Sequence, residues 1–247
     1  MPDEQIKELM REAPLSFVGT VEHLGAATMS DIPVDERTAV IRVDHVLHAP
    51  EALARLEGQR VSLQLTAGTD PPAVGESAAF FTKGLAFGES IALTEIGRLP
   101  VAEVEPRVTA ATQAGHARPL LDLESELAAE RLGEHAAAAD AVVVGTVTSL
   151  AKVAGHRVAE HDPDWWKATI AVEHAERGDV KGDVEVLYAN SRDVRWQTSP
   201  KPRASQHGLW VLHATEGDLK EEAPFQILHK EDFQPVQSLD ALRTNGG

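Results

Sequence analysis

A repeated segment constrains this chain more than any other feature of its sequence. Residues 17–21 read FVGTV, and residues 141–147 read AVVVGTV. Similar segments follow each copy in the same order. The segment AVIRV at 39–43 matches ATIAV at 168–172, and RVSLQL at 60–65 matches DVEVL at 183–187. Further along, AAFF at 78–81 matches LWVL at 209–212, and IALTEIGRLP at 91–100 matches FQILHKEDFQP at 225–235. Internal similarity of this kind indicates one module that occurs twice, so we expect two similar domains within the 247 residues.

Each copy contains five short apolar or alternating runs separated by glycine, proline and polar residues, a pattern typical of strands in a small β-domain. The predicted strands of the first copy are 16–24, 38–47, 60–66, 77–83 and 90–99, and those of the second copy are 141–153, 167–175, 184–189, 208–214 and 225–230. Gly19 and Gly145 occupy the same place in the first strand of each copy. A glycine inside a strand often marks a bulge or a sharp bend, so we expect the same bend in both copies.

A helical pattern precedes each set of strands, at 3–12 and at 120–140, where apolar residues recur at helical spacing. Residues 100–119 have little periodicity and contain proline and glycine, which predicts a linker. We therefore predict a mainly β protein of two tandem five-stranded OB-like Greek-key barrels, each preceded by an α-helix. The predicted domains are 1–108, the first module with its N-terminal helix, and 109–247, the linker, helix and second module.

The strand pattern "VVVGTV … ATIAVEHAERGDVKGDVEVLY … GLWVLH" resembles the OB-fold modules of netrin-like and TIMP-like proteins. The matching turns are RG at 177–178 and KG at 181–182, and the resemblance covers about 15–100 and 141–236. That family depends on disulfides and inhibits proteases through an N-terminal cysteine. This chain has no cysteine, so the resemblance implies a fold and supplies no functional residue.

Composition disfavours some functional classes and excludes others. The formal net charge is -16, so the surface as a whole repels nucleic-acid phosphates and anionic membranes. The absence of cysteine excludes disulfides, thiolate catalysis and cysteine-ligated zinc. No apolar run approaches the ~20 residues that cross a bilayer. The charged first residues, MPDEQIKELMRE, contain no signal peptide, so we expect a cytoplasmic location unless an export signal has been trimmed.

The best candidate site lies in two polar segments of the second module, 160–166 and 190–203. They hold three of the four tryptophans and four basic residues, which are types that anchor protein interfaces. The candidate partner-binding residues are Trp165, Trp166, Arg192, Arg195, Trp196, Lys201 and Arg203. We expect a non-enzymatic protein-binding or assembly module that engages another protein, or a second copy, through this surface. In the alternative interpretation the tryptophans close the barrel end and the arginines pair with nearby aspartates.

Two further functions stay open. A metal-dependent hydrolase could use His161, Asp162, Asp164 and His207, if the segments that carry them meet. Single-stranded nucleic acid could stack on the tryptophans, although the overall charge disfavours it. The sequence contains no GxSxG elbow, no HExxH pair and no phosphate-binding GxxxxGK[ST] loop, so an enzyme is the less favoured class and no cofactor is predicted.

Overall fold

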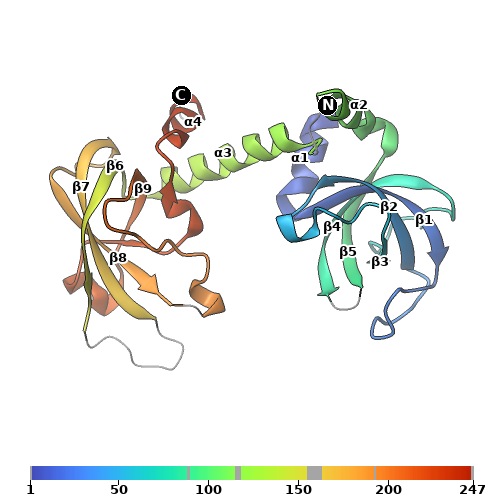
Figure 1. The fold of residues 1–247 in the computed structure, drawn as a ribbon, viewed down its shortest axis with the longest axis horizontal. Coiled ribbons are helices and arrows are strands. Elements are labelled where there is room, and N and C mark those ends of the chain that lie inside the picture. The colour runs from blue at the N-terminus through green and yellow to red at the C-terminus, as the bar shows by residue number, and fades with distance from the viewer. Residues whose placement is uncertain (1, 88–89, 115–117, 155–162, 192, 246–247) are drawn as a thin grey trace. The chain divides into compact units, whose positions relative to one another are not determined.

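The computed structural model describes residues 1–247 except 1, 88–89, 115–117, 155–162, 192 and 246–247 (Figure 1). The chain divides into two compact units, Met1–Leu127 and Ala128–Gly247. The predicted boundary at 108 falls earlier, inside the helix Val101–Gln113. No helix in the described residues is both long enough and apolar enough to span a lipid bilayer.

The first unit is a closed five-stranded barrel. Its elements are α1 (Pro2–Glu12), β1 (Leu15–Leu24), β2 (Thr38–His48), η1 (Glu51–Leu53), β3 (Arg60–Gln64), β4 (Ser77–Phe87), β5 (Ile91–Pro100), α2 (Val101–Gln113) and the first part of α3 (Leu121–Ala138). The strands follow the order β1-β2-β3-β5-β4, and β4 returns to pair with β1. The pairing of β3 with β5 is parallel, whereas the other pairings are antiparallel.

The second unit repeats this pairing. Its elements after α3 are β6 (Ala141–Lys152), β7 (Asp164–Arg177), β8 (Asp183–Asn190), η2 (Val194–Trp196), β9 (His207–Ala214), η3 (Gly217–Glu221), β10 (Phe225–Ile227), η4 (Lys230–Asp232), β11 (Phe233–Gln234) and α4 (Ser238–Asn245). The ring runs β6-β7-β8-β10-β9, and β8 and β10 are parallel, as β3 and β5 are. The additional strand β11 pairs with β9. The prediction of two OB-like barrels, each preceded by a helix, is confirmed.

The two strand glycines have the same structural role. The ladder register shifts at Val18/Gly19 in β1 and at Val144/Gly145 in β6, so the predicted irregularity is present in both barrels. A Cβ on Gly19 would lie 2.8 Å from the carbonyl oxygen of Arg42, and one on Gly145 would lie 2.5 Å from that of Ala171. Both glycines are therefore required because the neighbouring strand approaches too closely for a side chain.

Each barrel encloses one apolar core and packs a second one outside, against its helices. The inner core of the first unit includes Phe17 and Phe80, and the outer cluster joins α1 to leucines of α3. In the second unit the inner core surrounds Trp210, which is fully buried. Its indole Nε1 donates a 3.0 Å hydrogen bond to the carbonyl oxygen of Gly145. This bond satisfies the buried indole and fixes the carbonyl at the bulge.

The structure differs from the sequence prediction in the linker and in the bounds of several strands. The predicted linker 100–119 contains α2, which has Pro106 inside it and packs Val104 into the outer cluster. The predicted strand 225–230 ends at Ile227, where the chain turns into η4. The strand β7 begins at Asp164, so Trp165 and Trp166 lie in a strand and not in the preceding loop.

Candidate functional site

The predicted tryptophan surface separates into two environments. Trp165 and Trp166 follow one another in β7, so their side chains leave opposite faces of the sheet. Trp166 packs against the inner barrel core, with its ring centroid 6.4 Å from that of Tyr188. Its buried Nε1 has no hydrogen-bond partner. Trp166 therefore packs on the inner core of the barrel.

Trp165 and Trp196 do meet. Their ring centroids lie 5.7 Å apart with the ring planes at 70°, which is an edge-to-face contact. Trp165 also packs on a small apolar cluster that contains Val153, Leu187 and Ala223. Both tryptophans are half-buried. Their contact holds η2, which follows β8 in the chain, against the start of β7.

Lys201 anchors the same segment from inside. Its Nζ donates hydrogen bonds to the carbonyl oxygen of Trp196 at 2.9 Å, to that of Ser199 at 3.1 Å and to the Ser199 hydroxyl at 2.8 Å. These three bonds use all three ammonium protons. Burial lowers the pKa of Lys201. At the other end of η2, the Asp193 carboxylate accepts a 2.9 Å hydrogen bond from the backbone N–H of Arg195. Lys201 thus ties the segment together through hydrogen bonds within it.

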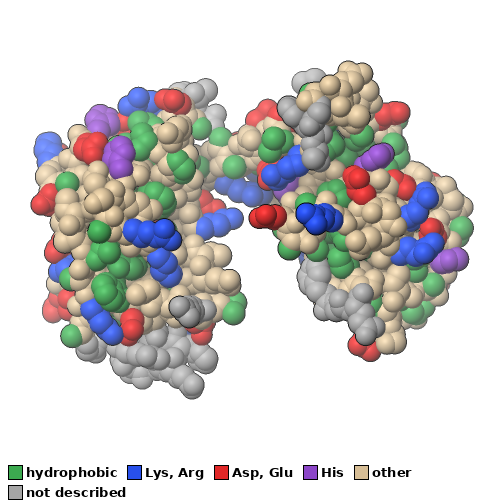
Figure 2. Space-filling model, viewed as in Figure 1, with side chains coloured by type: hydrophobic (Ala, Val, Ile, Leu, Met, Phe, Trp, Pro, Cys, Tyr) green, Lys and Arg blue, Asp and Glu red, His purple; other side chains and the backbone are tan. Residues whose placement is uncertain are grey.

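The outward part of this segment is a small basic and apolar tip. Val194 is 85% exposed, the largest exposed fraction among the large apolar side chains of the described residues. Arg195 beside it and Arg203 further along are also exposed, whereas Arg192 lies outside the described residues. Figure 2 shows hydrophobic side chains next to Lys and Arg side chains on the viewed face of the second unit. We refer to Val194, Arg195 and Trp196 as the η2 tip.

The four residues predicted as metal ligands do not form a ligand set in the part of the chain that the structure describes. His161 and Asp162 lie outside the described residues. Asp164 forms an ion pair with Lys152, with 3.2 Å between Oδ2 and Nζ. His207 lies with Nε2 3.2 Å from Oε2 of Glu173. Each described member of the predicted set therefore has a partner of its own.

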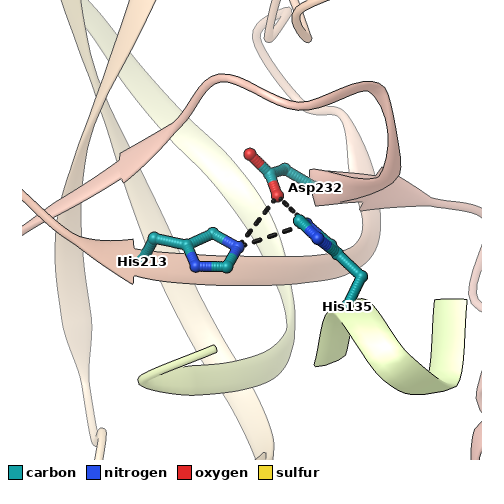
Figure 3. A group of neighbouring side chains, drawn as sticks. All are labelled: His135, His213 and Asp232. Atoms are coloured by element: carbon teal, nitrogen blue, oxygen red, sulfur yellow. Dashed lines mark hydrogen bonds and ion pairs between the residues drawn. The ribbon is translucent and has the colours of Figure 1, made fainter. Parts of the chain in front are cut away.

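A different histidine cluster lies elsewhere in the second unit, and the sequence analysis missed it. His135 comes from α3, His213 from β9 and Asp232 from η4, and the three side chains point toward one another (Figure 3). The His135 Nε2 lies 2.5 Å from Asp232 Oδ1 and 3.1 Å from His213 Nε2. The His213 Nε2 lies 3.3 Å from the same carboxylate oxygen. Two ring nitrogens and one oxygen therefore face a common point.

The surroundings of the cluster orient its carboxylate. Asp232 is fully buried, and its Oδ2 accepts hydrogen bonds from the backbone N–H groups of Leu228 at 2.6 Å and His229 at 2.8 Å. These bonds leave Oδ1 directed at the two rings. Burial lowers the pKa of His213, the Asp232 charge opposes that shift, and the neighbouring rings of His135 and His229 reinforce it.

The sequence contained no local signal for this cluster. His213 is 78 residues from His135, and Asp232 is 97 residues from it. The predicted set instead combined three residues close together in sequence, His161, Asp162 and Asp164, with the distant His207. The 3-10 helix η4 lies between β10 and β11, and both of these strands pair with β9, which places Asp232 beside His213.

The comparisons with known proteins leave the site to be interpreted from its own chemistry. No model of a known protein family matches the chain, and no curated protein is significantly similar to it in sequence.

Proposed function

We propose that the chain is a non-enzymatic binding module whose second barrel docks another protein through the η2 tip. The observation that carries this proposal is the exposure of Val194, at 85%, on a turn whose backbone is hydrogen-bonded by Asp193 and Lys201. The Asp193 cap and the three Lys201 hydrogen bonds fix the backbone around it. A turn that is ordered before binding loses little conformational entropy when a partner arrives.

The chemistry of the tip defines the kind of partner. Full burial of a valine side chain contributes roughly 1.5–3 kcal/mol, and an arginine at an interface pairs well with carboxylates. The partner surface should therefore offer an apolar pocket with acidic groups beside it. The chain as a whole carries a net charge of -16. Arg195 and Arg203 would give this region a positive local charge, opposite in sign to the charge of the whole molecule.

Single-stranded nucleic acid fits this site less well. Binding by stacking needs aromatic faces open to the bases, together with several uncompensated cations. Trp165 and Trp196 are half-buried and turn an edge toward a face, and the Lys201 ammonium is used within the loop. Of the basic residues that the sequence suggested, two, Arg195 and Arg203, are exposed in the described residues, which is fewer than the several cations that such binding needs.

A pair of matched variants tests the proposal. Val194 lies in the connection between the third and fourth strands of the second barrel, and Val74, 60% exposed, lies in the corresponding connection of the first. We expect Val194→Asp to remove a co-purifying protein from an affinity purification in the source organism's lysate. Val74→Asp should leave that protein bound.

The same purification discriminates the alternatives. Arg195→Glu should act as Val194→Asp does, since it reverses the charge beside the same contact. Recovery of nucleic acid, with binding lost as salt increases, would support the nucleic-acid interpretation instead. Equal recovery of every co-purifying protein with all three variants would contradict a docking role for the η2 tip.

A further inference from the structure

We propose that His135, His213 and Asp232 form a binding site for a divalent transition metal of the zinc class, a site that is separate from the η2 tip. The donor set is two imidazole nitrogens and one carboxylate oxygen, which are ordinary protein ligands of zinc. Imidazole favours zinc, copper and nickel over magnesium and calcium, which prefer oxygen ligands. The chemistry of the donors therefore selects the class of ion.

The distances fit such an ion. Zinc bonds of about 2.0–2.1 Å at tetrahedral angles place neighbouring ligand atoms about 3.3 Å apart. The three separations here are 2.5, 3.1 and 3.3 Å. Two of them match the tetrahedral edge closely, and the contact between His135 Nε2 and Asp232 Oδ1 needs to lengthen by less than about 1 Å.

The surrounding contacts are those of a site with oriented ligands. The second oxygen of Asp232 is held by two backbone N–H groups, at 2.6 and 2.8 Å, so the first oxygen keeps its direction. Hydrogen bonds of this kind to a ligating carboxylate orient it and tune its affinity. The buried carboxylate has no Lys or Arg partner among the ion pairs of the described residues, and the two histidines are the residues that contact its Oδ1. A cation at the common point would compensate it.

Three protein ligands leave one tetrahedral position for water. The side chains of His135 and His213 retain 19% and 23% exposure, so the cluster lies close to the surface of the second unit. An ion bound here would also join three segments, α3, β9 and η4, that are distant in the sequence. The site would thus add stability to the second unit whenever the metal is present.

The test is a zinc titration of the full chain after chelator treatment, by competition with a metal-binding dye at neutral pH. We expect one high-affinity equivalent, unaffected by millimolar magnesium. His135→Ala and His213→Ala should each weaken it at least about a hundredfold, more than the 10–100-fold typical of an outer-shell partner. His207→Ala is the matched control, because His207 pairs with Glu173 and has no third ligand beside it in the described residues; it should bind zinc as the wild type does.

A second measurement covers the case in which a ligand variant fails to fold. X-ray absorption of the zinc-loaded wild type should show two imidazole ligands together with oxygen ligands. A spectrum without imidazole scattering would overturn the proposal, as would wild-type affinity in His135→Ala and His213→Ala. Loss of the high-affinity equivalent in His207→Ala alone would place the metal elsewhere and would also overturn it.

Discussion

Replacement of Gly145 by alanine should destabilise the second barrel by an amount that the structure allows us to estimate. The added Cβ would lie 2.5 Å from the Ala171 carbonyl oxygen and 2.8 Å from Cγ2 of Ile170. The first of these neighbours is backbone in the β6–β7 ladder, so it cannot rotate away. Overpacking of this kind typically costs about 1–3 kcal/mol. To relieve the clash the backbone at residue 145 would have to move, and this movement would also disturb the hydrogen bond from Trp210 to the carbonyl oxygen of residue 145.

The assay can be specific to the second unit. All four tryptophans lie there, at 165, 166, 196 and 210, so tryptophan fluorescence reports the unfolding of this unit. A loss of about 2 kcal/mol should lower the melting temperature by roughly 8 °C for a unit of this size. The control is Gly133→Ala in α3, where an added Cβ meets nothing within 4 Å. Removing a helical glycine should stabilise by about 0.5–1 kcal/mol.

The stabilities of Gly145→Ala and Gly133→Ala, measured side by side, test whether close approach of β7 is the reason for the glycine at 145. If Gly145→Ala were as stable as the wild type, or gained as much stability as Gly133→Ala, the close approach of β7 would not be the reason for the glycine. The equivalence of Gly19 and Gly145 would then be a coincidence of sequence. The expected result is a loss in one variant and a gain in the other.

Two further predictions concern loop anchoring and pH. Lys201→Met should speed amide hydrogen exchange at Ser199 about tenfold or more, because hydrogen bonds to a charged donor contribute about 1.5–3 kcal/mol. The exchange is measured by mass spectrometry, and an unchanged rate would contradict the role of Lys201 in holding this loop. The hydrogen bond from Arg243 lowers the pKa of Glu176 below its usual 4.5. The stability from this pair is therefore present above pH 4.5 and is lost as the pH falls through the lower folded pKa. Arg243→Gln should thus be less stable than the wild type at pH 7 and equally stable once the carboxyl is protonated, as followed by urea unfolding.

The architecture was predictable because the repeat and the strand pattern are local properties. Short alternating runs and one glycine in each first strand carried the prediction of two barrels, and the register shifts at Gly19 and Gly145 agree with it. The helix α2 was missed because Pro106 lies inside it, although Val101, Val104 and Val108 recur at helical spacing and pack on the outer cluster. Trp165 and Trp166 were assigned to a loop because polar residues precede them, whereas pairing with β8 makes them strand.

The candidate sites also divide into features that local sequence indicates and features that depend on the folded structure. The sequence pointed to the segment around Trp196 because unusual residue types gather there. It could not separate Lys201, which anchors the loop, from Arg195, which is exposed, since that difference depends on the path of the backbone. It also could not find His135, His213 and Asp232, because three elements must fold together before their ligand atoms meet.

The most direct test of the docking role is site-specific photo-crosslinking in cells of the source organism. A photoreactive residue replaces Val194 in one variant and Val74 in the other, so that each exposed valine reports on its own connection between third and fourth strands. We expect a discrete crosslinked protein at position 194 that is absent at position 74 and is lost when Arg195→Glu is added. Identical crosslinking at both positions, or none at 194, would contradict the docking role.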